Sequence, residues 1–319
     1  MATPTLNHEF AQDILEGLRT VPKAIPSRYF YDERGDRIFQ QIMAMPTYYL
    51  TNCEHEILEK EKETILELIG GAKKPFQLIE LGAGDGTKTK VLLEHFLQKQ
   101  LDFEYLPIDI SENALSLLTH DLHTNFPELA VRPTQGEYFE ALHNLAQNSD
   151  VRKVILFLGA NIGNFNTEQA LDFLKKIAET LQKDDILLIG FDLKKDPATI
   201  LAAYNDKEGI TKSFNLNLLE RINRELGGNF NRDHFEHYPL YNPETGEMKS
   251  YLISTKEQEV FIEALDQDFH FNAWETIHVE VSKKFEIAQI NAMAEKAGFH
   301  MIGNLFDSRR YFVDSIWQK

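Results

Sequence analysis

The chain has 319 residues, 43% of them hydrophobic, which is enough to bury the core of one large or two modest domains. Its formal net charge is −17, from 50 acidic and 33 basic side chains, and an acidic chain is repelled by phosphate backbones. We therefore expect no nucleic-acid partner and favour a small, soluble substrate. The strongly apolar runs, such as residues 154–158, are too short to span a bilayer, so no membrane association is expected.

The cysteine and histidine content narrows the chemistry further. A single cysteine, Cys53, excludes an internal disulfide framework and suits a reducing compartment, so we expect a cytoplasmic protein, and we expect it to act as a monomer. Residues 1–8 are polar and lack a secretory pattern. The histidine pairs 120/123 and 234/237 have no clear further ligands, so no metal site is expected.

The first part of the chain, residues 8–70, is expected to form helices and turns, because prolines interrupt its periodicity. Apolar strands and amphipathic helices then alternate over residues 75–192, which predicts a mostly parallel sheet with helices on both faces. The predicted strands are 76–81, 103–109, 154–159 and 185–191, and the predicted helices are 87–98, 112–122 and 167–182.

The later part of the chain predicts an insertion into this sheet domain. Residues 197–226 have a helical apolar stripe, and strands are expected over 248–264 and 276–285, with a hairpin between 248–254 and 259–264. A closing helix that stops at Gly298 and two strands, 300–306 and 311–317, predict an antiparallel edge on the sheet. The expected domains are 60–196 plus 286–319, and 8–59 plus 197–285.

A glycine-rich turn follows the first predicted strand of the sheet. Gly82, Gly84 and Gly86 stand between that strand and a helix, and such a turn can touch a ligand with its backbone. A dinucleotide fingerprint needs a sixth-position glycine where Thr87 stands, and the ending of a phosphate loop is absent. An acidic strand end before Leu-Gly-x-Gly-x-Gly is more typical of an S-adenosylmethionine (SAM) methyltransferase. A glycine-rich turn of another α/β protein is the alternative.

Two acidic residues strengthen this interpretation. Asp109 closes the second predicted strand and can accept hydrogen bonds from a ribose diol. The alternative role for Asp109 is to cap the next helix, which Ser111 suits at least as well. Glu137 lies further along and, by its position, could reach an adenine amino group.

A second polar group lies near the end of the inserted segment. Strict alternation places His278, Glu280 and Ser282 on one face of a strand. A carboxylate accepts from N–H groups and a hydroxyl donates or accepts, so an imidazole or an ammonium would satisfy the pair. Tyr31 and Tyr48 belong to an aromatic-rich N-terminal region, and aromatic faces attract cations. A solvated strand face and ordinary core packing are the alternatives.

Several segments together resemble the histidine-specific SAM methyltransferases of ergothioneine biosynthesis. They cover nearly the whole chain in the same order and are residues 25–35, 45–49, 80–84, 157–164, 192–196, 214–215 with 223–226, and 280–285. The resemblance implies an α/β fold, with a Rossmann-like, mostly parallel SAM-binding sheet that has an antiparallel edge strand, and a second α+β domain for the substrate. It also implies SAM as cofactor, no metal, and methylation of the α-amine of L-histidine to the trimethylated betaine, hercynine.

The same resemblance implies roles for individual residues. SAM would be bound by Gly82, Gly84, Lys88, Asp109, Glu137 and Tyr138. The amino acid would be bound by Tyr48, Asn164, Tyr204, Ser250, Glu280 and Ser282, with Tyr31 and Asn164 acting at the reacting amine. The chain departs from the family pattern at Leu50-Thr51-Asn52, Asn161, Glu137, Ser250 and Leu216. These departures leave SAM binding expected and the exact substrate open.

Three other functions stay open at this point. The same fold could methylate another amino acid or a tryptophan-derived amine. The chain could be a non-catalytic protein that binds SAM or another metabolite. A nicotinamide-dependent oxidoreductase is the third, and Thr87 opposes it.

Overall fold

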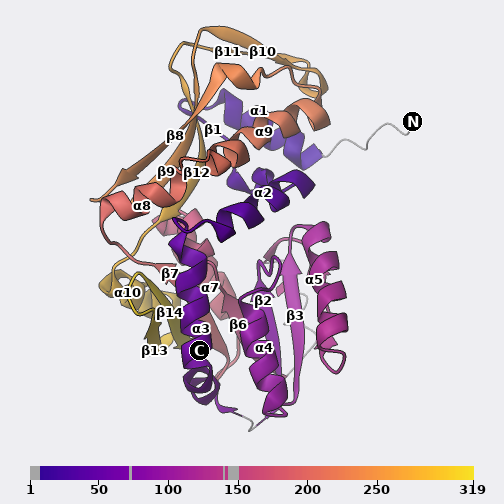
Figure 1. Cartoon of the computed structure of the whole chain (residues 1–319), viewed down its shortest axis with the longest axis vertical. Coiled ribbons are helices and arrows are strands. Elements are labelled where there is room, and N and C mark those ends of the chain that lie inside the picture. Colours follow the sequence, from indigo (N-terminus) through magenta and orange to yellow (C-terminus); the bar gives the residue numbers. More distant parts are fainter. Residues whose placement is uncertain (1–7, 72–73, 139–140, 143–150) are drawn as a thin grey trace. The chain divides into compact units, whose positions relative to one another are not determined.

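The computed structural model describes residues 8–71, 74–138, 141–142 and 151–319, and the chain divides into two units (Figure 1). The sheet unit comprises Tyr49–Lys195 and Lys283–Lys319, and the second unit comprises the chain up to Tyr48 together with Asp196–Ser282. The first division falls earlier than the expected boundary between 59 and 60. The reason is that helix α3 (Tyr49–Leu68) runs unbroken through that boundary and packs on the large sheet.

The sheet unit has the alternating order that the sequence predicts. Its elements are α3 (Tyr49–Leu68), β2 (Phe76–Leu81), α4 (Thr89–Gln98), β3 (Phe103–Asp109), α5 (Glu112–Asn125), β4 (Ala130–Val131), β5 (Thr134–Gln135), β6 (Arg152–Phe157), η3 (Asn161–Asn164), α7 (Thr167–Thr180), β7 (Ile186–Asp192), α10 (Ile287–Ala297), β13 (His300–Phe306) and β14 (Phe312–Gln318). The strand order is β13-β14-β7-β6-β2-β3-β4, with β5 also paired to β3. This arrangement confirms the α/β fold.

Strand direction in the sheet is parallel except at one place. The pairs β2–β3, β2–β6 and β6–β7 are parallel, whereas β14 pairs antiparallel with both β7 and β13. The antiparallel strand therefore lies one place in from the edge, because the β13–β14 hairpin inserts its second strand beside β7. The chain leaves β2 toward β3 on one side and reaches β6 on the other. Ligands of such sheets bind at this reversal of strand order, beyond the carboxyl end of β2.

The two faces of the sheet are covered by different helices. Alternate residues of the strands, such as Ile79 and Ile155, share an apolar core with Phe173 of α7 and Ile290 of α10. On the other face α3 packs against α4 and against β14 (Figure 1). The predicted helix ends are confirmed where sequence signals are strong: Ser111 caps α5 by accepting from the Ala114 N–H at 3.1 Å.

The second unit combines helices with two small sheets. Its elements are α1 (His8–Arg19), β1 (Lys23–Ala24), η1 (Ser27–Phe30), α2 (Glu33–Ala44), α8 (Pro197–Tyr204), α9 (Ile210–Leu226), η4 (Arg232–His234), β8 (Phe235–Asn242), β9 (Glu247–Ser254), β10 (Gln258–Ile262), η5 (Glu263–Leu265), β11 (Gln267–Phe271) and β12 (Thr276–Lys283). One sheet has the order β1-β12-β9-β8, and the other pairs β10 with β11. The apolar face of α9 shares a core with α1, α2 and both sheets.

One sequence prediction in this unit is wrong. The expected hairpin between 248–254 and 259–264 does not form, because β9 pairs antiparallel with β8 and β10 pairs with β11. The polar turn after Asn242 joins β8 to β9, so β9 already has its hairpin partner on the N-terminal side. The segment 197–226, which the sequence predicts to be helical, forms two helices, and Gly209, with a φ of 74°, precedes the second.

Glu80 gives the sheet unit a testable pH dependence. It is buried in β2, accepts from Thr89 Oγ1 at 2.5 Å and from the Tyr105 hydroxyl, and burial raises its pKa from 4.5 to about 7. Folding therefore retains a proton that the unfolded chain loses between about pH 4.5 and 7. Glu80 therefore stabilises the fold fully below about pH 4.5. This contribution to the free energy of unfolding, about 3 kcal/mol in total, is lost as the pH rises to about 7.

We expect Glu80→Gln to lose less stability than the wild type as pH rises. Glutamine stays neutral, so the variant has no proton to release on unfolding at this position. Urea denaturation at about pH 5 and about pH 8 measures the change in unfolding free energy. Glu104→Gln, on the neighbouring strand β3, is the control and should keep the wild-type pH dependence. An unchanged pH dependence in Glu80→Gln would contradict this role.

Candidate functional site

The glycine turn after β2 presents bare backbone beside a carboxylate. Gly82, Gly84 and Gly86 have φ values of 76°, 55° and 65°, a region that glycine adopts without strain. A Cβ placed on Gly84 would meet no atom within 4 Å, so this part of the backbone borders open space. Asp109 Oδ2 accepts from the Gly84 N–H at 2.9 Å, and Oδ1 accepts from the Ser111 N–H at 2.9 Å. These bonds fix the Asp109 carboxylate beside the turn.

Two polar side chains converge on the first glycine of the turn. A Cβ on Gly82 would lie 2.8 Å from the Tyr138 hydroxyl and 3.2 Å from Asn161 Nδ2. The Tyr138 ring packs edge-on against Phe157 and Phe173, at centroid distances of 5.8 and 6.2 Å. Burial raises the pKa of the Tyr138 phenol, so it stays a neutral donor. The hydroxyl and the amide therefore frame the backbone of Gly82.

Lys88 lies within the sheet unit against a buried acid. Its Nζ forms an ion pair with Glu54, which is fully buried and also accepts from the Gly159 N–H at 2.8 and 2.9 Å. Burial alone would lower the pKa of Lys88, but Glu54 raises it overall, so the ammonium stays charged. A Cβ on Gly159 would lie 3.2 Å from Lys88 Nζ, which places the ammonium at the turn after β6.

The remaining predicted residues of this unit are exposed. Glu137 follows β5, where Gln135 pairs with Asp109, so it is held near the end of β3. Asn164 is the last residue of the short helix η3.

These residues fit SAM. An aspartate at the end of the second strand offers the acceptor that a ribose diol requires, and the open backbone at Gly84 admits a ligand in direct contact with the main chain. Asp109 and Glu137 place negative charge near the end of β3, which favours a positively charged ligand over a pyrophosphate, whereas the charge of Glu54 is balanced by Lys88.

In the second unit, aromatic rings connect most of the predicted substrate residues. Tyr31 lies 5.5 Å from Phe39, Phe39 lies 6.4 Å from Tyr48, and Tyr48 lies 6.2 Å from Tyr204, all edge-to-face between ring centroids. The Tyr204 hydroxyl then donates to Ser282 Oγ at 2.8 Å. A continuous series of side-chain contacts thus runs from Tyr31 to Ser282. It includes residues of α2, of the segments that flank α2, of α8 and of β12.

The predicted acid and hydroxyl pair stands at the end of this series of contacts on β12. Glu280 and Ser282 are two residues apart on the strand, and Ser250 Oγ of β9 donates to Glu280 Oε2 at 2.9 Å. Ser250 is buried, with 1% of its surface exposed, so it holds the carboxylate in place. His278 of the same strand lies against Tyr251 at 5.4 Å, and burial lowers its pKa.

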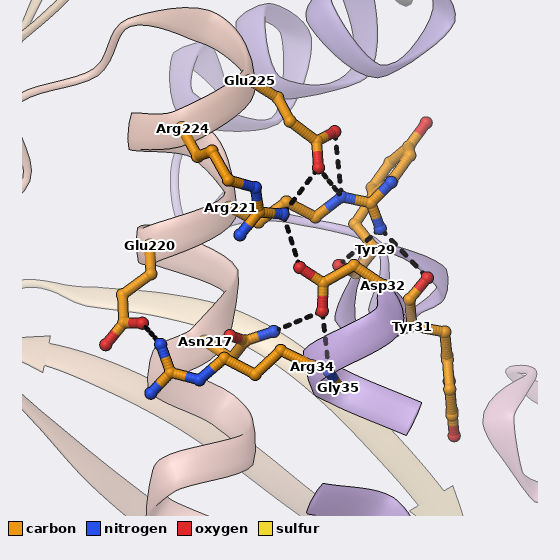
Figure 2. A network of polar contacts seen from close by, with 10 residues as sticks. All are labelled: Tyr29, Tyr31, Asp32, Arg34, Gly35, Asn217, Glu220, Arg221, Arg224 and Glu225. Atoms are coloured by element: carbon orange, nitrogen blue, oxygen red, sulfur yellow. Dashed lines mark hydrogen bonds and ion pairs between the residues drawn. The ribbon is translucent and has the colours of Figure 1, made fainter. Parts of the chain in front are cut away.

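A polar network holds Tyr31 in position (Figure 2). Asp32 caps α2 by accepting from the Gly35 N–H at 2.7 Å, and it pairs with Arg224 at 2.5 Å. Burial would raise the pKa of Asp32, but these bonds lower it overall. Arg221 donates to the Tyr31 carbonyl at 3.2 Å, while the Tyr31 ring points away from the network. The backbone of Tyr31 is therefore tied to α9.

Sequence reasoning did not single out Phe39 and Glu54, and it considered His237 only as one member of a histidine pair without further metal ligands. Phe39 has the spacing of a core residue on the amphipathic helix α2, and Glu54 stands in a charged helical run, so neither has a distinguishing pattern. His237 Nε2 lies 3.0 Å from the Tyr204 carbonyl oxygen, and the strand that carries it was not predicted.

Metal and membrane features were searched over the described residues alone. Within them, no three His, Cys, Asp or Glu side chains are grouped so as to hold a metal ion. The helices of those same residues include none that is long and apolar enough to cross a membrane.

Comparison with known proteins identifies the family. Residues 10–319 match the family described as histidine-specific, SAM-dependent methyltransferases. The chain is 33% identical to histidine N-alpha-methyltransferase of Mycolicibacterium smegmatis over 298 residues, 93% of this chain and 91% of that one. It is 31% identical to ergothioneine biosynthesis protein 1 of Schizosaccharomyces pombe, covering 87% of this chain and 36% of that one. An L-tryptophan methyltransferase of Psilocybe serbica is 28% identical, over 94% and 90% of the two chains. The chain therefore belongs to the family of SAM-dependent, histidine-specific methyltransferases.

Proposed function

We propose that this protein methylates the α-amino group of L-histidine with SAM and continues to the trimethylated betaine, hercynine. The observation that carries the proposal is the position of the Glu280 carboxylate. Glu280 and Ser282 lie on the same strand, β12, and Ser250 of β9 donates a hydrogen bond to Glu280. The family, with its histidine-named and ergothioneine-named relatives, supports the same substrate.

Glu280 and Ser282 are suited to recognise an imidazole ring. A carboxylate offers about four acceptor positions, so Glu280 can accept from a ring N–H as well as from Ser250. Ser282 is aligned by the Tyr204 hydroxyl, and its own hydroxyl can donate or accept at the ring. A site built to bond a substrate N–H discriminates strongly against analogues that lack it.

In this reaction the protein mainly orients the reactants and takes little covalent part itself. SAM, when bound, supplies an activated methyl group and leaves as S-adenosylhomocysteine. The amine must be neutral to attack, and a free α-amino group titrates near ~8, so a neutral fraction is present at pH 7. Tyr31, Tyr48 and Tyr204 present a row of rings, and aromatic faces stabilise the cationic amine that methylation leaves.

We propose that Asp109 and the glycine turn bind SAM, with Tyr138 and Glu137 toward the adenine and Lys88 among its ligands. The bonds of Asp109 to Gly84 and Ser111 preorganise the carboxylate. Asn164 remains a prediction for the amine and carboxylate of the amino acid, since it rests on the family pattern alone.

A panel of amino acids tests the substrate. The purified chain is incubated with SAM and each of the twenty common amino acids, and release of S-adenosylhomocysteine is measured. We expect histidine to exceed every other amino acid by at least about tenfold in kcat/KM, because only its imidazole offers two ring nitrogens, one for Glu280 and one for Ser282, whereas the indole of tryptophan has a single N–H and no ring acceptor. A higher kcat/KM for tryptophan would instead support methylation of tryptophan, the activity for which the Psilocybe relative is named. No release with any amine would support a non-catalytic role.

Ser250→Ala tests whether Ser250 orients Glu280. Loss of one bond to a charged group costs about 1.5–3 kcal/mol, so we expect KM for histidine to rise by roughly 10- to 100-fold. KM for SAM should be unchanged. The matched control is Ser254→Ala on the same strand, because Ser254 Oγ donates to the Lys256 carbonyl at 2.7 Å instead. An equal rise in KM in both variants would contradict the proposed role of Ser250.

A further inference from the structure

Four buried polar side chains of the sheet unit form a cluster that the proposed reaction does not use. Tyr49, Asp192, Lys195 and Lys284 make up this anchor cluster. The Asp192 carboxylate accepts from the Tyr49 hydroxyl at 2.8 Å, from Lys284 Nζ at 2.8 Å, and from Lys195 Nζ. Lys195 Nζ also donates to the Tyr49 hydroxyl at 2.9 Å. One carboxylate thus joins three other side chains.

The anchor cluster is sealed from solvent. The side chains of Asp192 and Lys284 are 0% exposed and that of Lys195 is 5% exposed. Lys195 also lies over the rings of Tyr49 and Tyr311, at 4.3 and 5.4 Å from their centroids. Buried ions cost several kcal/mol each unless they are well paired, so such a cluster contributes more to fixing a geometry than to stability.

Its members stand where the chain passes between the two units. There are three such passages, at Tyr48/Tyr49, at Lys195/Asp196 and at Ser282/Lys283. Tyr49 begins the sheet unit after the first passage, Lys195 ends its first segment before the second, and Lys284 follows the third. The Phe285 N–H also donates to the Asp192 carbonyl at 2.8 Å, which joins the second and third passages through their backbones. Asp192 therefore binds a side chain from every passage.

We propose that Asp192 is a positioning residue for histidine methylation, because it anchors all three passages to the sheet unit. Tyr48 precedes Tyr49 directly, and Ser282 lies two residues before Lys284, so two proposed substrate residues emerge from anchored points. Releasing Asp192 frees the backbone on which these residues are carried. The effect on turnover rests on the proposed function, whereas the effect on the passages does not.

Hydrogen exchange and kinetics on Asp192→Asn test the anchor. We expect amide exchange in the peptides 45–52, 192–198 and 280–286 to accelerate together, by about tenfold or more. With histidine and saturating SAM, kcat should fall by about tenfold, while the Kd for S-adenosylhomocysteine stays within about twofold of wild type. Tyr49→Phe, which removes only one hydroxyl, should give the same pattern with a smaller amplitude, and it serves if Asp192→Asn does not fold.

The matched control is Asp185→Asn at the opposite end of β7. Asp185 is 2% exposed and accepts from the N–H groups of Lys153 and Gln182, both at 2.8 Å. Replacing it should destabilise the sheet unit without accelerating amide exchange at the three passages more than elsewhere in that unit. The proposal is overturned if amide exchange at the three passages rises no more in the Asp192 and Tyr49 variants than it does in the control. It is also overturned if S-adenosylhomocysteine affinity falls by as much as kcat. A wild-type protein inactive on histidine would refute the proposed function, and the exchange data would still decide the anchor.

Discussion

Glu280→Ala is expected to abolish most histidine turnover while leaving SAM binding intact. Removing one partner of a buried, hydrogen-bonded charge pair costs about 2–5 kcal/mol, so kcat/KM for histidine should fall by a factor of roughly 30 to several thousand. The variant also leaves the Ser250 hydroxyl without the carboxylate to which it donates. Glu280→Gln should lose less, because its amide oxygen still accepts from Ser250 or from the ring.

The measurement is a steady-state titration of histidine at saturating SAM, paired with calorimetry of S-adenosylhomocysteine binding. Glu275→Gln is the control, because Glu275 also belongs to the second unit and pairs with Lys23 and the Asn272 N–H, but lies outside the proposed site. A Glu280→Ala variant that loses histidine turnover and S-adenosylhomocysteine affinity to the same extent would contradict the assigned role.

Asp109→Ala is expected to have the opposite signature. The carboxylate would bond the ribose hydroxyls, and hydrogen bonds to charged groups contribute about 1.5–3 kcal/mol each, so SAM affinity should fall by roughly 100-fold or more. The change also removes the bonds that hold the N–H groups of Gly84 and Ser111, which loosens the turn. Turnover at low SAM should be lost, whereas saturating SAM should recover part of it.

Calorimetry of S-adenosylhomocysteine binding measures this effect directly. Glu104→Gln is the matched control, since Glu104 lies on the same strand but pairs with Arg132 on the protein surface. It should retain wild-type affinity. An unchanged affinity in Asp109→Ala would remove the cofactor assignment, and an equal loss in both variants would reduce it to a general effect on β3.

The sequence predicted the sheet unit well because its signals are local. The apolar run before the glycines, Ser111 as a helix cap and Gly298 as a helix stop each act over a few residues, and the structure confirms them. The β8–β9 pairing was missed because β8 alternates buried and exposed residues but contains Pro239, which weakens a strand prediction. With β8 overlooked, β10 is the next predicted strand with which β9 could pair.

The sequence supplied candidate residues for the site but not the contacts among them. Alternation placed Glu280 and Ser282 on one strand face, but their bonds to Ser250 and Tyr204 join residues 30 and 78 positions apart. Phe39 links Tyr31 to Tyr48 only through the fold of α2. The anchor cluster, drawn from residues near 49, 192 and 284, leaves no local pattern either. Contacts between distant segments are set by tertiary packing, which periodicity does not encode.

One measurement tests the central claim most directly: tandem mass spectrometry of histidine incubated with this protein and SAM carrying a labelled methyl group. We expect histidine to gain three labelled methyl groups, all on the α-nitrogen, with one- and two-methyl species as transient intermediates. Histidine that gains no label, or that carries it on the imidazole ring, would contradict the account.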